Sequence, residues 1–396
     1  MRTYENRNVQ FVVKSSKFCN LRCRYCYEYA ELGSREAITL EQLEQMFKNI
    51  FSHYSQLNHA TNIDFIWHGG EPLLQHPDYY WQAFELQRKI FRSLNGSIRN
   101  CVQTNLTTLN QERLKLLKEG FDAIGVSVDL FGDLRVTQRG VTSQPVVMAN
   151  MEWLRQEGIS FACLTVLTKL NLPHLQEIYD FYATKGIAFR VLPLFEGAFD
   201  GQHQGYEISP EEVLAAFCTL AELSLTSQKP VRVSPIDEYI RQVIYHHCRD
   251  SAPSFYDKRE WESIYLVNTN GDVYSYSDAY NPEFKHGNLC TTPLTDIIHS
   301  PAHNKVIAAA EQRMASACSS CSYYGECSGY PMAEESVGYN LVDEYGNARC
   351  IQVKGTLEYI EKRLKQIGFI NPITSKLSFA ASASLSESVA EPLSVF

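Results

Sequence analysis

Three cysteines near the N-terminus have the type and spacing to hold an iron–sulfur cluster. Cys19, Cys23 and Cys26 are separated by three residues and then by two, and Tyr25 directly precedes the third thiol. Three thiolates on one short loop suit a cubane [4Fe–4S] cluster, whose fourth iron then has no protein ligand. We therefore expect a cluster that binds a small molecule at its open iron, with a zinc site or a redox loop as the alternative.

A second motif supports the cluster interpretation. The run 63–68 has the apolar character of a buried strand, and Gly69, Gly70, Glu71 and Pro72 follow it. Two glycines let the backbone approach a ligand closely, and the glutamate supplies an acceptor for an ammonium group. Together with the cysteine spacing, this turn resembles the radical S-adenosylmethionine (SAM) enzymes, in which such a turn hydrogen-bonds the amino group of the SAM methionine.

The resemblance implies a reaction and several contacts. The reduced cluster donates one electron to SAM in that family, which gives methionine and a 5′-deoxyadenosyl radical that removes a hydrogen atom from an unreactive C–H bond. Tyr25 is expected to lie against the adenine, and Ser127 and Asp129 match positions that contact the ribose or the methionine in relatives. Arg139 resembles the arginine that pairs with the SAM carboxylate. Ordinary strand-end or surface roles are the alternatives for these side chains.

The pattern of apolar residues predicts where these groups lie. Strand-like runs occur at 9–14, 63–68, 100–105, 123–129, 160–167 and 189–194. Helical patterns lie between them at 40–53, 80–94, 110–119, 146–156 and 172–185. Six βα units predict an α/β fold with a parallel sheet and match the partial (β/α)6 TIM-like barrel of the radical SAM enzymes. Sites in such barrels lie at the C-terminal ends of the strands, so Gln103 and Asn105, which end the third strand, are expected to face the substrate.

Four cysteines in the C-terminal half predict a second cluster. Cys318, Cys321 and Cys327 are followed by Cys350, and a run near 265–276 has the pattern of a small β-hairpin. This arrangement resembles a SPASM or twitch domain, a small iron–sulfur module of a hairpin and helices found largely in enzymes that modify peptides and proteins. Four thiolates complete the coordination of a [4Fe–4S] cluster, so the resemblance implies one auxiliary cluster with an electron-transfer or structural role; a structural zinc site is the alternative.

The ligands of a further SPASM cluster are missing from the sequence. Tyr276 and Pro331 stand where that pattern has cysteines. The catalytic aspartate of sulfatase-maturing relatives directly follows the first of these cysteines, whereas Asp278 stands one residue later, which makes sulfatase maturation doubtful. Tyr276 and Asp278 are candidate catalytic groups near the substrate, with a surface position on the hairpin as the alternative. Cys248 and Cys290 have no assigned role.

Composition limits the classes of partner. The chain has 396 residues and a formal net charge of −9, which argues against binding to nucleic acid. No apolar run reaches the roughly eighteen residues of a membrane span, and with 12 cysteines and no apolar leader we expect a cytoplasmic protein. We divide the chain into a radical SAM barrel at 1–205, a helical connector at 206–255, a truncated SPASM or twitch-like domain at 256–370 and a mobile tail at 371–396.

These features favour a peptide maturase with two [4Fe–4S] clusters and SAM as cofactors. The expected substrate is a ribosomal precursor peptide, and the expected outcome is crosslinking of the cyclophane type or backbone excision of the splicease type. A peptide epimerase, a small-molecule radical SAM dehydrogenase and a non-catalytic binding subunit are the alternatives. No leader-binding domain is recognisable, so we expect a small leader-binding partner protein, together with an electron donor such as flavodoxin or ferredoxin.

Overall fold

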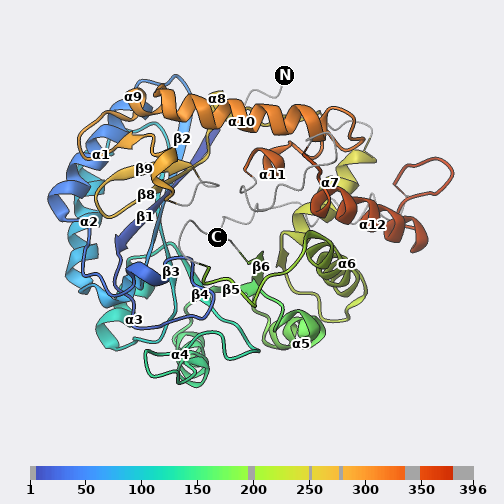
Figure 1. The fold of residues 1–396 in the computed structure, drawn as a ribbon, viewed down its shortest axis with the longest axis horizontal. Coiled ribbons are helices and arrows are strands. Elements are labelled where there is room, and N and C mark those ends of the chain that lie inside the picture. Colours follow the sequence, from blue (N-terminus) through green and yellow to red (C-terminus); the bar gives the residue numbers. More distant parts are fainter. Residues whose placement is uncertain (1–5, 195–200, 249–251, 276–279, 335–347, 378–396) are drawn as a thin grey trace.

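The fold is built on one large sheet. The computed structural model describes residues 6–194, 201–248, 252–275, 280–334 and 348–377. Within these ranges ten strands form a single sheet in the order β10-β9-β8-β1-β2-β3-β4-β5-β6-β7 (Figure 1). The pairs from β8 through β1 to β7 are parallel, and the two pairs that involve β9 are antiparallel.

Six βα units make up most of the sheet and its cover. The strands are β1 (Asn6–Ser16), β2 (Ala60–Gly69), β3 (Ile98–Thr104), β4 (Ala123–Ser127), β5 (Ala162–Leu167) and β6 (Phe189–Pro193). The helices that follow them are α1 (Leu40–Tyr54), α2 (Pro77–Ile90), α3 (Gln111–Glu119), α4 (Gln144–Gln156), α5 (Leu175–Lys185) and α6 (Pro210–Thr226). The predicted α/β fold is confirmed, and the predicted elements differ from the observed ones by a few residues at their ends.

The two faces of the curved sheet differ in exposure. Outward-facing aromatic side chains such as Phe11, Phe65 and Trp67 are completely buried beneath the helices, which follow the outside of the sheet (Figure 1). Ser127 and Leu164 on the inner face are half-buried, and along β5 half-buried and buried residues alternate strictly. Other polar side chains along the sheet, such as Gln103 and Lys14, are buried, so exposure of the inner face is confined to part of the sheet.

The predicted hairpin is present and extends the barrel sheet. It consists of β8 (Ile264–Val267) and β9 (Asp272–Ser275), which are antiparallel to each other. β8 also pairs in parallel with β1, in the register Gln10 to Ile264. The C-terminal region is therefore joined to the barrel by backbone hydrogen bonds as well as by side-chain packing.

The remaining helices and strands are short, apart from two long helices near the C-terminus. They are β7 (Val233–Ser234), α7 (Ile236–His246), α8 (Lys258–Trp261), β10 (Gly287–Asn288), α9 (Leu294–Ile298), α10 (Pro301–Cys318), α11 (Tyr330–Ala333) and α12 (Gln352–Gln366). α12 packs on α6 and α7. In the part of the chain that the structure describes, no helix is both long and apolar enough to span a membrane.

The start of the predicted mobile tail is folded. Residues 371–377 form a turn in which Asn371 N donates to the Lys376 carbonyl over 2.8 Å, and the carbonyl of Ser375 lies 2.7 Å from His247 Nδ1. The mobility of this stretch stays a prediction. The rest of the predicted tail, 378–396, lies outside the described residues.

A buried ionic network joins separate segments of the C-terminal region. Lys258 Nζ lies 3.0 Å from Glu262 and 2.7 Å from Glu334, and His303 Nε2 lies 3.0 Å from the Glu262 carboxylate. None of these four side chains is more than 3% exposed. Removing one member of such a network leaves an uncompensated buried charge, so the network rigidly connects α8, α10 and α11.

A second buried histidine lies next to this network. His286 Nε2 is 2.8 Å from the Ser275 hydroxyl, and the His286 ring packs against the His303 ring at 4.7 Å between centroids. Burial, together with the neighbouring His303, lowers the pKa of His286 to about 3. The imidazole is therefore neutral in the folded protein at every pH at which the protein would normally be handled.

His286 should make the folded protein sensitive to acid. The unfolded chain binds a proton at this histidine as the pH falls through about 6.5, whereas the folded protein does so only near pH 3. Stability is therefore lost as the pH falls, by about 1.4 kcal/mol between pH 8 and pH 5.5. We expect His286→Gln to show a correspondingly smaller change in the free energy of unfolding by urea between these two pH values. His76→Gln, at an exposed side chain, is the control, and identical pH dependence in wild type and His286→Gln would contradict the assignment.

Candidate cofactor and active site

The three N-terminal cysteines lie on the loop that follows β1. Cys19 and Cys23 are buried, Cys26 is half-buried, and all three pack with Leu21 and Leu32 in one apolar cluster. Two backbone hydrogen bonds of 3.1 Å shape the loop, from Cys19 N to Leu32 O and from Cys26 N to Cys23 O. Burial, with the Glu71 carboxylate nearby, raises the pKa of Cys19 to about 12. Metal binding would displace these protons.

The donor set has the composition that an iron–sulfur cluster needs. Cys19, Cys23 and Cys26 place three thiols on one buried loop, and each thiolate of a cubane binds a different iron. Within the described ranges, no three His, Cys, Asp or Glu side chains are placed as the ligands of one metal ion would be.

Two lysines anchor the segment that follows the third cysteine. Lys14, near the end of β1, is completely buried, and its Nζ lies 2.7 Å from the Glu28 carboxylate and 3.7 Å from the centroid of the Tyr280 ring. Lys17 Nζ lies 2.8 Å from the carboxylate of Glu31. These ion pairs tie the cysteine loop to β1 and to the C-terminal region, and their burial makes them costly to break.

Gly69 at the end of β2 and Gly70 directly after it pack closely against the chain that enters the cysteine loop. Gly70 N donates to the Ser16 carbonyl over 2.8 Å, and Glu71 N donates to the Phe18 carbonyl over 3.0 Å. A Cβ atom at Gly70 would lie 2.3 Å from the Phe18 oxygen, and one at Gly69 would lie 2.3 Å from the Ser16 oxygen. The glycines therefore admit the chain that enters the cysteine loop, and their predicted contact with SAM stays a prediction.

Glu71 is a fully buried carboxylate at the centre of the site. Its Oε1 accepts hydrogen bonds from Thr104 Oγ1 at 2.6 Å and Leu73 N at 2.9 Å, and its Oε2 accepts one from Asn105 N at 2.6 Å. Burial raises the pKa of Glu71, against the effect of these hydrogen bonds. A carboxylate accepts about four hydrogen bonds, so these contacts leave Oε2 able to receive one more donor.

Asp129 and Tyr25, which were both predicted to contact SAM, contact each other. Asp129 Oδ2 accepts hydrogen bonds from the Tyr25 hydroxyl at 2.5 Å and from Arg135 Nε at 2.8 Å, and its Oδ1 accepts one from Val166 N at 2.9 Å. These bonds join the cysteine loop to the ends of β4 and β5. Burial lowers the pKa of the Arg135 guanidinium, but the neighbouring Asp129 and Tyr25 raise it by more. The net effect is a raised pKa.

The structure separates Arg139 from this group and brings in Arg135 instead. Arg139 is exposed on a turn that ends at Gly140, whose φ is +76°. Arg135, which the sequence analysis missed, lies beside Asp129 and places its Nη1 4.0 Å from Cys23 Sγ. The signal was the presence of two arginines four residues apart on one loop; only the backbone register shows which one faces the thiols.

The remaining predicted polar residues lie together on the inner face. Gln103 Nε2 donates to Ser127 Oγ over 2.7 Å, which links the ends of β3 and β4. Asn105 Nδ2 donates to Asn20 Oδ1 over 3.1 Å and lies 3.8 Å from Cys19 Sγ. These contacts place Asn105 beside the cysteine loop and Gln103 farther along the inner face.

The C-terminal cysteines form a second group. Cys318 ends α10, and Cys321 N donates to the Cys318 carbonyl over 3.0 Å. Burial, with Cys327 and Cys321 as neighbours, raises the pKa of Cys318 to about 11. Cys350 packs against the apolar cluster that contains Cys318. A donor set of four thiols in this setting fits an auxiliary iron–sulfur cluster.

Three other residues of the sequence analysis are not part of the two cysteine groups described above or lie outside the described residues. Tyr276 and Asp278 lie outside the described residues, immediately after β9. Cys290 Sγ lies 3.7 Å from the Gln42 carbonyl of α1, and a Cβ at Gly271 would lie 2.3 Å from the same sulfur. Cys290 is thus packed into the contact between the hairpin turn and α1, away from both cysteine groups.

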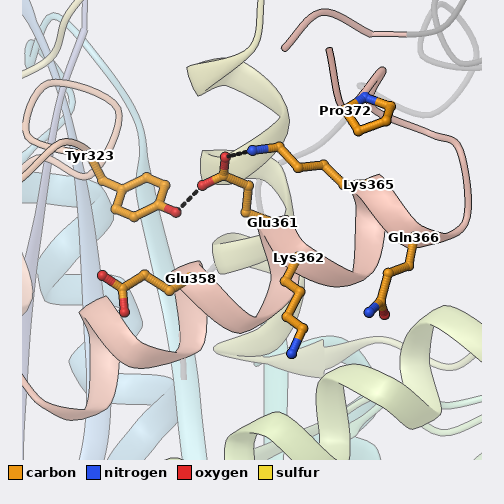
Figure 2. A pocket seen from close by; sticks show the side chains of 7 residues that line it. All are labelled: Tyr323, Glu358, Glu361, Lys362, Lys365, Gln366 and Pro372. Carbon is orange, nitrogen blue, oxygen red and sulfur yellow. Dashed lines mark hydrogen bonds and ion pairs between the residues drawn. The ribbon is translucent and has the colours of Figure 1, made fainter. Parts of the chain in front are cut away.

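A pocket on α12 contains none of the predicted site residues. Figure 2 shows Tyr323, from the loop between Cys321 and Cys327, directed at Glu361, which accepts its hydroxyl hydrogen bond and pairs with Lys365 at 2.6 Å. The lining comes from α12 and its neighbouring loops and includes no strand end of the barrel. This pocket is therefore separate from the candidate site.

Replacing Gly70 by alanine should displace the cysteine loop. The new Cβ would lie 2.3 Å from the Phe18 oxygen and 2.5 Å from the Lys17 oxygen, and both are backbone atoms that cannot rotate away. We expect Gly70→Ala to lose about half of the iron that the reconstituted protein binds, because one of two cubanes is lost. Gly33→Ala is the matched control on the same loop, since nothing lies within 4 Å of its Cβ position. Equal iron contents in the two variants would refute this explanation.

Comparisons with known families agree with the geometry. A profile described as the radical SAM superfamily matches residues 13–182, from β1 into α5, and a profile for the SPASM iron–sulfur cluster-binding domain matches residues 259–322. The serine-type anaerobic sulfatase-maturating enzyme of Bacteroides thetaiotaomicron is 24% identical over 343 residues, which are 78% of this chain and 79% of that protein. The cysteine-type enzyme of Clostridium novyi is 23% identical over 336 residues, which are 81% and 87%.

Solved structures share the fold. Native anSMEcpe with bound AdoMet and the Kp18Cys peptide superposes with a TM-score of 0.68 at 18% identity, covering 91% of this chain and 99% of that one. SuiB of Streptococcus suis bound to S-adenosylmethionine has a TM-score of 0.59 at 15% identity, covering 86% and 77%. With the two profiles in the expected order, this chain belongs to the radical SAM enzymes that carry a C-terminal SPASM domain.

Proposed function

We propose that this protein is a radical SAM enzyme that modifies a ribosomally made precursor peptide. The observation that carries the proposal is the buried loop of three thiols beside the ends of β2, β3 and β4. Asn105, after β3, lies 3.8 Å from Cys19 Sγ and holds Glu71, after β2. Asp129, after β4, accepts the hydroxyl hydrogen bond of Tyr25 in the loop. The named relatives mature sulfatases, and one of the similar solved structures holds a peptide.

Each residue of the candidate site would have its own role in binding the cluster, SAM or the substrate. Cys19, Cys23 and Cys26 would bind three irons of a [4Fe–4S] cluster, and the remaining place on Glu71 Oε2 would accept the ammonium group of SAM. SAM bound to the reduced cluster supplies a 5′-deoxyadenosyl radical. Asp129 fixes the Tyr25 ring in the cysteine loop through its hydroxyl. Ser127 and Gln103 lie on the inner face, where they would contact the ribose or the substrate.

The final step of the proposed reaction would form or break a bond in the substrate peptide. We propose either crosslinking through carbon or excision of a backbone segment after hydrogen abstraction, with epimerisation and small-molecule dehydrogenation as alternatives. Sulfatase maturation is disfavoured because Ser277 stands where the aspartate follows in those relatives. The four cysteines at positions 318, 321, 327 and 350 would hold a second [4Fe–4S] cluster with no open iron, suited to electron transfer or structure.

Two protein partners follow from the proposal. Reduction of the cluster needs a one-electron donor such as flavodoxin or ferredoxin. No leader-binding domain is recognisable in the sequence, so we propose a separate small protein that binds the leader of the precursor. Strand addition of the leader to the sheet edge near β9 and β10 is the alternative mode of docking.

The peptide proposal can be tested with the precursor encoded beside the gene. Anaerobically reconstituted protein with SAM, dithionite and that peptide should release 5′-deoxyadenosine and change the peptide mass. Cys19→Ala should abolish both, because the cluster would lose one of its three ligands. Cys218→Ala, at a half-buried thiol on α6, is the control and should retain both. Release of 5′-deoxyadenosine without any change in peptide mass, with or without a candidate leader-binding protein, would reject crosslinking and excision; if no D-residue is formed either, it would reject the substrate class while leaving the SAM chemistry intact.

Iron content should distinguish the proposed clusters. Two cubanes give about eight irons per chain. The double variant Cys321→Ser/Cys327→Ser removes two ligands of the C-terminal group and should lower the content to about four irons, without affecting the cluster at Cys19. Stoichiometric zinc, with about four irons in the wild type, would show instead that the C-terminal group is a zinc site.

A further inference from the structure

One buried arginine faces the N-terminal thiols without a role in the proposed function. Arg135 lies opposite Cys23 because the backbone of residues 22–24 pairs with that of residues 134–136 through two hydrogen bonds, of 2.6 and 2.9 Å. The two bonds lie on either side of Cys23 and Arg135. The backbone pairing therefore determines that the side chain of residue 135 faces the Cys23 thiol. This position does not depend on the rotamer of the arginine.

The guanidinium is divided between two partners. Nε donates to Asp129 Oδ2 over 2.8 Å, and Nη1 lies 4.0 Å from Cys23 Sγ within hydrogen-bonding geometry for sulfur. The side chain is only 13% exposed, and its Cζ lies 5.7 Å from the centroid of the Tyr25 ring. Asp129 already accepts bonds from Tyr25 and Val166, so it holds the guanidinium in place with little freedom to turn away from the sulfur.

Such an arrangement can change the reduction potential of a bound cluster as well as hold the loop in position. An N–H donor and a positive charge beside a ligating sulfur stabilise the more negative, reduced state of an iron–sulfur cluster. The effect is strong in a buried site because little water screens it. We propose that Arg135 donates to Cys23 Sγ and thereby raises the reduction potential of the cluster that Cys19, Cys23 and Cys26 would bind; this rests on the proposed cofactor site.

A purely structural role for Arg135 makes a different prediction. If the side chain only held the loop, its removal would lower cluster content or stability but would leave the potential of the bound cluster unchanged. If it acted on SAM alone, its removal would change SAM affinity and leave the potential without SAM unchanged. The potential measured in the absence of SAM separates the three roles.

The test is a redox titration of anaerobically reconstituted protein without SAM, followed by electron paramagnetic resonance. We expect Arg135→Gln to make one-electron reduction of the N-terminal cluster about tenfold less favourable, which is a fall in potential of about 59 mV. Arg135→Lys keeps the charge but loses the planar guanidinium. The reduction potential of the N-terminal cluster in this variant should therefore lie between the potentials in the wild type and in Arg135→Gln. Arg155→Gln removes an exposed arginine from α4 and should leave the potential unchanged. The Cys321→Ser/Cys327→Ser background isolates the signal of the N-terminal cluster.

The outcomes are distinct. A potential in Arg135→Gln equal to that of the wild type overturns the inference while leaving the proposed function standing. If Arg135→Gln binds no cluster, Arg135→Lys is measured in its place, and an unchanged potential there overturns the inference in the same way. Loss of the cluster from both variants, with Arg155→Gln intact, shows a structural role and also overturns it. Absence of any N-terminal cluster from the wild type refutes the proposed cofactor site itself.

Discussion

The position of the cysteine loop is the constraint on which the rest of the site depends. The loop is held on one side by hydrogen bonds from Gly70 and Glu71 to the chain that enters it, and on the other by the pairing of residues 22–24 with 134–136. Both sets of bonds are between backbone groups, so they do not depend on rotamers. They bring the buried thiols, the Glu71 carboxylate and the Arg135 guanidinium to one place.

Much of the architecture was accessible from the sequence because it depends on local periodicity. Apolar runs buried on both faces of a parallel sheet, alternating with amphipathic helices, predict βα units without knowledge of tertiary contacts. Thiol positions were equally accessible, since three ligands on one short loop are close in space whatever the fold. The structure confirms the βα units and the hairpin of β8 and β9, and it places the three N-terminal cysteines in one apolar cluster on the loop after β1.

The polar contacts of the site were harder to predict, for physical reasons. Arg135 and Arg139 lie on one loop without periodicity, and pairing with the cysteine loop decides which of them turns inward. The close approach of the glycines to the cysteine loop was equally hard to foresee, because close approach of another backbone segment and close approach of a ligand require the same residue. The buried network around Lys258 joins residues up to 76 positions apart, a separation at which sequence patterns carry no contact information.

The pairing of β8 with β1 limits how a large substrate can enter. β1 lies between β2 and β8, so the strand that leads into the cysteine loop is hydrogen-bonded on both edges. A clamshell movement of the hairpin away from the barrel would break those bonds and expose unpaired backbone groups. The hairpin therefore stays joined to the strand that leads into the cysteine loop, so any opening of the molecule has to occur elsewhere than between β8 and β1.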